Sequence, residues 1–136
     1  MISNDTEVVK AFISAINRHD IPGLSALMSA NHSFVDSSGR ILSGRENMTA
    51  GWREYFRMFP DYQIQAERFL ADGAYVAVFG SASGTYNGKR GLIAENRVAM
   101  PAAWKAVVEK GEVLLWQVYA DWTEGWKTIE KDNEAG

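Results

Sequence analysis

The sequence predicts an α+β fold in which three N-terminal helices pack against a strongly curved antiparallel sheet. Apolar residues recur at helical spacing as far as about residue 59, and from Asp61 onward they alternate with a period of two. Helix and strand patterns do not alternate along the chain, which argues against a parallel α/β sheet. A length of 136 residues fits one domain with a real core, so we expect a single domain over 1–136.

The three helices are predicted from caps and apolar stripes. The first is expected over about 4–17, where Asn4 and Glu7 have capping-box spacing. Asp20 can cap a short second helix that carries Pro22 in its first turn. Ser43 and Glu46 form a second capping box for the third helix, which should end before Pro60. The third helix has the most apolar face, formed by Met48, Trp52, Tyr55, Phe56 and Phe59.

The strands are predicted from alternation and turn residues. A short strand is expected at Phe34-Val35, and Asp72-Gly73 is typical of a hairpin turn. Later strands are expected over 74–86, 96–109 and 112–122, with a bulge or an edge position at Pro101. We expect an ordered core over about 4–126 and a polar, partly frayed tail over 127–136.

The composition excludes several classes of function. The chain has no cysteine, so disulfides, thiolate metal sites and cysteine nucleophiles are excluded. Its net charge is -3 and its basic residues are scattered, so we expect no nucleic-acid partner. No apolar run is long enough to span a membrane, and no basic patch followed by an apolar stretch indicates a secretory signal, so we expect a cytoplasmic protein.

Several short motifs, in order, resemble the SnoaL-like branch of the nuclear transport factor 2-like superfamily. They are Val9-Lys10-Ala11-Phe12, Phe34-Val35-Asp36, Ser43-Gly44-Arg45, Phe59-Pro60-Asp61, Ala71-Asp72-Gly73 and Gly111-Glu112-Val113. The resemblance implies a cystatin-like α+β roll: a cone with an apolar pocket at its wide end, and commonly a homodimer. The superfamily includes ketosteroid isomerases, polyketide cyclases, epoxide hydrolases, dehydratases and non-catalytic modules, so the fold does not choose a function.

Asp36 is the main catalytic candidate. In the resemblance to ketosteroid isomerases, the segment 34–39 is similar to the one that holds the proton-transferring aspartate. Phe34 and Asp36 should leave the strand on the same face, and an apolar neighbour favours a carboxyl with a raised pKa, suited to a general base. The alternative is that Asp36 caps the following turn through its side chain.

The other catalytic groups of these relatives do not carry over. The isomerase phenol would fall at Phe12 and the protonated acid at Trp104, whose indole can donate a hydrogen bond but cannot titrate. The aspartate of the polyketide cyclases would fall at Val118. Asp121 is nearby but should face the other way, so it is a weak candidate and is expected to close the strand end.

The number of aromatic residues indicates an aromatic-lined pocket as the ligand-binding surface. Five tryptophans are more aromatic volume than one small core usually needs, and an aromatic pocket suits planar, apolar ligands. The alternative is that these rings fill a core or a dimer interface. The expected ligand-binding residues are Phe12, Phe34, Trp52, Tyr55, Phe56, Trp116 and Val118.

Two functional hypotheses follow. The first is a pocket protein for a small, apolar, aromatic or polycyclic molecule, with Asp36 as the acid–base group if it catalyses an isomerisation, cyclisation or dehydration and Trp104 as a hydrogen-bond donor. The second is a non-catalytic ligand-binding or dimerisation module, so whether the chain is an enzyme stays open. No cofactor is indicated. His19 and His32 lack partners at metal-ligand spacing, so we expect no metal.

Overall fold

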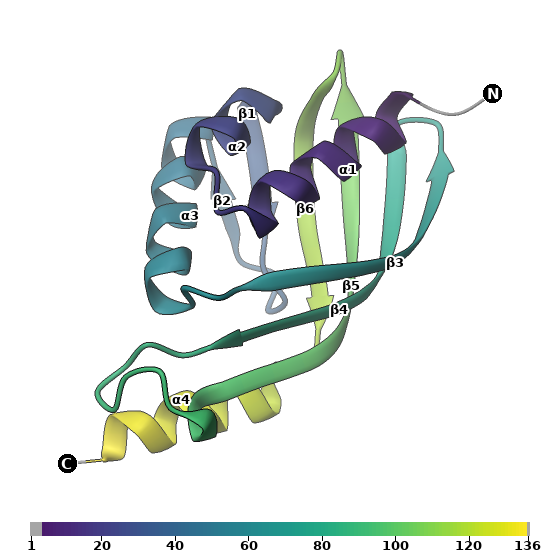
Figure 1. Ribbon diagram of the computed structural model, residues 1–136. Coiled ribbons are helices and arrows are strands. Elements are labelled where there is room, and N and C mark those ends of the chain that lie inside the picture. The colour runs from purple at the N-terminus through teal and green to yellow at the C-terminus, as the bar shows by residue number, and fades with distance from the viewer. Residues whose placement is uncertain (1–3, 136) are drawn as a thin grey trace.

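The computed structural model describes residues 4–135, which contain four α-helices and a six-stranded sheet (Figure 1). Met1–Ser3, which entered the expectation about a secretory signal, and Gly136, the last residue of the expected tail, lie outside the described residues. The elements are α1 (Asn4–Asn17), α2 (Ile21–Leu27), β1 (Met28–Val35), β2 (Ile41–Ser43), α3 (Arg45–Met58), β3 (Gln63–Asp72), β4 (Tyr75–Thr85), the short 3-10 helix η1 (Ala94–Asn96), β5 (Arg97–Glu109), β6 (Glu112–Ala120) and α4 (Thr123–Glu134).

The sheet has the order β2-β1-β6-β5-β4-β3 and is mixed. Neighbouring strands are antiparallel except for β1 and β6, which are parallel, with Phe34 opposite Trp116. The prediction of an antiparallel sheet is therefore wrong for this pair. A parallel pair needs a long connection between its strands, and here α3 and the strands β3 to β5 provide it. The strong curvature and the cone shape stay predictions.

Two helices cover one face of the sheet. α1 contacts β3, β5 and β6, and α3 contacts β1 and β2. The inward side of α1 carries Phe12 and Ile16, both fully buried. α3 follows two strands, so the expected run of three consecutive N-terminal helices is interrupted by β1 and β2. The opposite face of the sheet leaves Phe79 and Tyr119 about half exposed.

The helix starts agree with the sequence in one case and differ in another. Asp20 caps α2 as expected, because its carboxylate accepts a hydrogen bond from the Gly23 amide. The capping box predicted at Ser43 and Glu46 is wrong. Ser43 belongs to β2, and the residue before α3 is Gly44, whose φ of 99° lies in the left-handed region that favours glycine.

The end of α1 is fastened to the edge strand β3. The Asn17 side chain donates to the Ile64 carbonyl at 2.9 Å and accepts from the Ile64 amide at 2.8 Å. His19, one residue beyond Arg18, lies 2.9 Å from the Tyr62 carbonyl through its Nε2. These contacts fix the angle at which α1 lies on the sheet.

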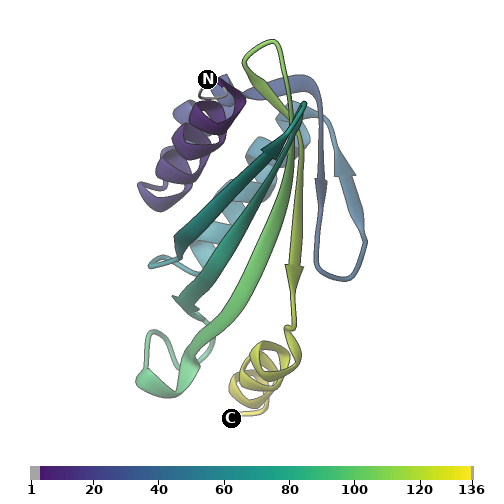
Figure 2. The ribbon, with the colours of Figure 1, turned by 90° about the vertical axis from the view of Figure 1, so that its right-hand side faces the viewer.

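The C-terminal end differs most from expectation. Residues 123–134 form the helix α4, not a polar, partly frayed tail, and α4 lies at the end of the sheet opposite α1 (Figure 2). Asp132 is completely buried on this helix and accepts hydrogen bonds from the Arg90 amide, the Arg90 Nε and the Asn96 Nδ2. We call Asp132, Arg90 and Asn96 the α4 latch. The latch explains why a helix with a polar sequence is ordered.

Within residues 4–135, none of the helices has the length and apolar character needed to cross a membrane.

Candidate functional site

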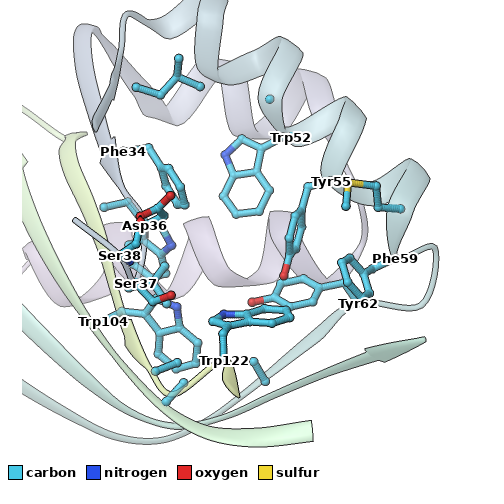
Figure 3. A pocket seen from close by; sticks show the side chains of 18 of the residues that line it. Phe34, Asp36, Ser37, Ser38, Trp52, Tyr55, Phe59, Tyr62, Trp104 and Trp122 are labelled. Atoms are coloured by element: carbon cyan, nitrogen blue, oxygen red, sulfur yellow. Dashed lines mark hydrogen bonds between the residues drawn. The ribbon is translucent and has the colours of Figure 1, made fainter. Parts of the chain in front are cut away.

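A cavity of about 380 Å³ lies between α3 and the inner face of the sheet, and α4 closes one end of it. Its wall comes from β1, α3, β4, β5, β6 and α4. Nine of the lining side chains are aromatic, and Figure 3 shows several of them around the space. The nine are Phe34, Trp52, Tyr55, Phe59, Tyr62, Trp104, Trp116, Trp122 and Trp126.

All five tryptophans of the chain line this cavity. They come from three regions far apart in the sequence: α3, the strands β5 and β6, and the beginning of α4. Trp104 and Trp116 stack with their ring centroids 6.2 Å apart and form one wall. Protein interiors are normally close-packed, so tryptophans that served only as core residues would fill the space between them. Here they surround an unfilled volume instead.

Three of the indoles have N–H groups without an acceptor. The Nε1 atoms of Trp52, Trp104 and Trp116 are buried and make no hydrogen bond among the described residues. A buried donor without a partner costs free energy, and such groups in a native structure need a reason. A ligand that brings acceptor oxygens close to this wall would supply partners after a small movement of the rings.

Tyr55 and Tyr62 bring the phenol groups of the site together. Their rings are 4.8 Å apart and nearly perpendicular. Burial raises the pKa of Tyr55 well above its usual value, and the neighbouring Tyr62 phenol with its hydrogen bond adds to this. Burial also raises the pKa of Tyr62, although the bond from Tyr55 opposes the shift. Both phenols are therefore neutral at physiological pH. The Tyr55 O–H donates to the Tyr62 oxygen, so Tyr62 is the phenol that can offer its O–H group to a ligand.

Asp36 lines the cavity and also caps a turn. Its Oδ1 accepts hydrogen bonds from the Ser38 amide, the Ser38 hydroxyl and the Arg40 amide. Partial burial pushes the pKa of Asp36 up, but these hydrogen bonds and the Arg40 charge outweigh it, so its pKa lies below the usual value. The raised pKa expected from Phe34 is not found, because β1 ends at Val35 and leaves Asp36 in the turn.

The family is decided by the sequence model of the SnoaL-like domain, which matches residues 9–116. The chain belongs to the SnoaL-like domain family. The match runs from α1 into β6 and includes the Asp36 turn and most of the cavity wall. Five of the cavity residues lie beyond it: Val118, Ala120, Trp122, Trp126 and Ile129. No curated protein is similar enough to the chain to count as a match.

Solved structures share the fold of this SnoaL-like chain at low identity. A protein with a ketosteroid isomerase-like fold from Catenulispora acidiphila, crystallised with trimethylamine, is 22% identical, covers 83% of this chain and 84% of its own, and has a TM-score of 0.73. A candidate polyketide cyclase from Xanthomonas campestris is 17% identical, with coverages of 93% and 96% and a TM-score of 0.83. An epoxide hydrolase from M. tuberculosis is 19% identical, with coverages of 97% and 93% and a TM-score of 0.77. Identities this low establish the fold only.

The structure brings most of the predicted site residues of the SnoaL-like chain to one cavity. The residues that line it are Phe34, Asp36, Trp52, Tyr55, Trp104, Trp116 and Val118. Phe12 and Phe56 lie outside the lining. Phe12 packs in the core, 5.0 Å from the Trp116 ring, and Phe56 stacks on His19 at 4.0 Å. Both pack against tryptophans of the lining, Phe12 against Trp116 and Phe56 against Trp52.

Asp121 lies outside the lining as well. It is exposed, and its Oδ1 accepts hydrogen bonds from the Thr123 amide and the Thr123 hydroxyl. These hydrogen bonds hold the pKa of Asp121 below its usual value. Its place at the start of α4 agrees with the structural interpretation, in which it closes the strand end.

The contribution of α4 to the site was not predicted from the sequence. Trp122, Trp126 and Ile129 are spaced four and three residues apart, which is the spacing of one helix face. That pattern could have predicted a fourth helix with an apolar side. It was hidden by the charged residues between and after these three positions. Tyr62 was not predicted as a site residue either, because it lies in the alternating pattern that begins after Asp61.

The histidines do not belong to the cavity. His32 is fully buried, and its Nδ1 lies 2.6 Å from the Val113 carbonyl, while Nε2 has no partner among the described residues. Burial lowers the pKa of His32, although the bond to Val113 opposes this. Residues 4–135 contain no cluster of three or more histidine, aspartate or glutamate side chains that could hold a metal ion.

Proposed function

We propose that this SnoaL-like chain binds a small, largely apolar ligand with an aromatic or polycyclic body in the cavity between α3 and the sheet. The observation that carries the proposal is the gathering of all five tryptophans around one unfilled volume of about 380 Å³. This volume lies in the range of small-molecule sites, which are mostly apolar with a few polar groups. Here the polar groups are Asp36, the Ser37 and Ser38 hydroxyls and the phenols of Tyr55 and Tyr62.

Binding is better supported than turnover. A general base works best when its pKa lies near the operating pH, and hydrogen bonds hold the pKa of Asp36 below its usual value. In the ligand-free protein Asp36 is therefore a stable anion and a weak base. This favours a non-catalytic ligand-binding module as the leading function.

Acid–base catalysis is the second candidate, in an isomerisation, cyclisation or dehydration. The observation in its favour is that Asp36 lines the cavity and that Oδ1 accepts the three hydrogen bonds of the turn, so Oδ2 can face a substrate. A bound apolar substrate would displace water around the carboxylate and raise its pKa. In this case the Trp104 indole, whose N–H has no acceptor among the described residues, would orient a carbonyl or hydroxyl oxygen.

A homodimer is proposed on the exposed face of the sheet. Phe79, Ala103 and Tyr119 face one another in register across β4, β5 and β6, and Phe79 and Tyr119 are 46% and 48% exposed. An apolar row of this kind on a sheet is typical of an interface between subunits. Light scattering that gives the mass of one chain at micromolar concentration would contradict the dimer. The cytoplasmic location stays an expectation.

The proposal is tested with two neighbouring alanines on opposite faces of β5. Ala102 lines the cavity and Ala103 does not. We expect planar carbonyl compounds, steroids and polyketide-like aromatics to change the tryptophan fluorescence of the wild type and to raise its melting temperature by mass action. Ala102→Leu fills the cavity and should abolish both effects, whereas Ala103→Leu should keep them.

The outcomes separate the two candidates. If no compound binds, or if Ala102→Leu binds as well as Ala103→Leu, the ligand does not use this cavity and the proposal fails. A compound that binds is then assayed for turnover with the wild type and with Asp36→Asn. Turnover that Asp36→Asn loses without losing affinity would replace the binding module with the enzyme.

A further inference from the structure

The lining of the cavity carries a single charged group, and it is negative. Among residues 4–135, Asp36 is the sole side chain of the lining that carries a charge at neutral pH, since no lysine, arginine or histidine of this range lines it. The phenols of Tyr55 and Tyr62 are neutral there because their pKa values are raised. A ligand carboxylate or phosphate would therefore meet an anion and no cation, and the neutral N–H and O–H donors of the wall alone would have to offset its lost hydration and the repulsion by Asp36.

The nearest basic side chain does not change this. Arg40 follows Asp36 in the same turn, and its charge contributes to the lowered pKa of the Asp36 carboxyl. Arg40 is exposed and is absent from the cavity lining. It is therefore a solvated charge outside the lining, and water and salt weaken its interaction with a ligand in the cavity.

The aromatic rings stand at large angles to one another and form a corner. Phe34 makes an angle of 68° with Trp52, and Tyr55 makes an angle of 87° with Trp52, each at a centroid separation of 6.2 Å. Figure 3 shows Trp52 on one side of the space and Trp122 on the opposite side, with Tyr55 and Tyr62 between them. Asp36 lies on the side of Phe34, across from the phenols.

Such a set of rings favours a cation. The faces of tryptophan, tyrosine and phenylalanine carry partial negative charge and attract an ammonium group within about 6 Å of the ring centre. The interaction is strongest where the cation has left water, as it would in this cavity. A carboxylate on the same wall adds a full negative charge, and its Oδ2 makes none of the turn contacts that occupy Oδ1.

We propose that the ligand carries a positively charged nitrogen, a protonated tertiary amine or a quaternary ammonium on an apolar body, which lies against the aromatic corner with Asp36 as its counter-ion. This inference rests on the proposed ligand-binding function and gives the chemical class of the ligand. It also gives Asp36 a role that needs no proton transfer, since a counter-ion must stay ionised.

The test compares two probes of the same shape that differ in charge. (4-Hydroxyphenyl)trimethylammonium and 4-tert-butylphenol share the ring and the hydroxyl group, and nitrogen replaces carbon at the branched centre. Both are titrated into the wild type at pH 6.5 by calorimetry, with tryptophan fluorescence as a second readout. We expect the cation to bind about tenfold or more tightly than the neutral probe, as a desolvated cation–π contact and a nearby carboxylate would give.

Two variants locate the source of the preference. Asp36→Asn keeps an oxygen that can cap the turn and removes the charge, so it should weaken the cation about tenfold and leave the neutral probe within about twofold. Trp122→Leu keeps an apolar side chain and removes a ring face, so it should also weaken the cation more than the neutral probe. A melting curve for each variant checks that it is folded.

The binding results test the cationic ligand and the cavity function separately. Equal or tighter binding of 4-tert-butylphenol by the wild type overturns the cationic ligand and leaves the apolar cavity function standing. A preference for the cation that survives unchanged in Asp36→Asn and in Trp122→Leu also overturns it, because the cation then binds elsewhere. If neither probe binds at millimolar concentration, the cationic ligand fails, and the cavity function fails with it only if the steroids and polyketide-like aromatics do not bind either.

Discussion

The space between the helices and the sheet is filled at one end and hollow at the other. Under α1, the side chains of Val9, Phe12, Ile16, Leu24 and Val113 have no exposed surface. Toward α4, the same sheet faces a cavity of about 380 Å³. The α1 end stabilises the fold through close packing, whereas the α4 end leaves apolar surface available to a ligand. One sheet thus serves stability and binding in separate regions.

The two ends are also closed by different forces. α1 is held by buried apolar side chains, and α4 is held largely by the latch formed by Asp132, Arg90 and Asn96. Burial in the core is insensitive to pH, but a latch built on a carboxylate is not. The comparison therefore predicts different responses to mutation and to acid.

The largest expected effect separates two phenylalanines. Phe12→Ala empties a packed site in the α1 core and should lower the free energy of unfolding by about 3–5 kcal/mol. Phe34→Ala removes a half-buried ring that already borders the cavity, so its cost should be about 1–2 kcal/mol. Denaturant unfolding of both variants measures the difference. Equal losses would mean that the cavity is closed in solution.

The second effect concerns acid stability. The hydrogen bonds from Asn96 and Arg90 lower the pKa of Asp132 to about 2, although burial opposes them. A carboxyl whose pKa is lowered by folding stabilises the protein above its unfolded pKa, and this contribution is lost as the pH falls from about 4 to about 2. Asp132→Asn should therefore have a lower melting temperature than the wild type at pH 6, and the gap should shrink toward pH 2.

The matched control for Asp132 lies at the other end of the same helix. Asp121→Asn changes an exposed carboxylate at the start of α4, so it should retain most of the acid dependence of the wild type. A pH-independent gap for Asp132→Asn, or an equal effect of Asp121→Asn, would show that the latch does not hold α4 through its charge.

The smallest effect on stability is expected at Trp126. Its side chain is 58% exposed although it lines the cavity, so Trp126→Ala should change the free energy of unfolding by no more than about 0.5 kcal/mol. It should weaken binding of a cavity ligand several-fold, because it opens the wall at the α4 end. Unchanged affinity, measured by titration, would restrict the site to the part lined by α3 and the sheet.

The sequence predicted the elements that are defined by local patterns. The cap at Asp20, the apolar face of α3 and the long strands follow from neighbouring residues alone, and they were found. The turn after Asp72 was also found, where Gly73 has a φ of 60°. A bulge or an edge position was expected at Pro101. It lies in the interior strand β5 and pairs with Ser81 of β4, but it lies beyond Ala102, the last β5 residue paired with β6, so it is unpaired on that side.

The errors arose where distant residues decide the structure. The parallel pairing of β1 with β6 joins residues about eighty positions apart and leaves no local signal. α4 depends on the latch, because Asp132 finds Arg90 and Asn96 only in the folded chain. Local polarity therefore suggested a tail. The pKa of Asp36 was misjudged for a related reason: the pattern placed it beside Phe34, but the amides that stabilise its charge come from the turn that follows.

The contact between Asn17 and Ile64 has a consequence for the behaviour of the protein at high concentration. The Asn17 side chain presents one acceptor and one donor to β3 in the way that a neighbouring strand would. β3 is the last strand of the sheet, and unpaired backbone groups at such an edge can recruit a strand from another molecule. Asn17 occupies the amide and the carbonyl of Ile64, so this part of the edge cannot pair with a strand of another molecule. The same side chain anchors α1.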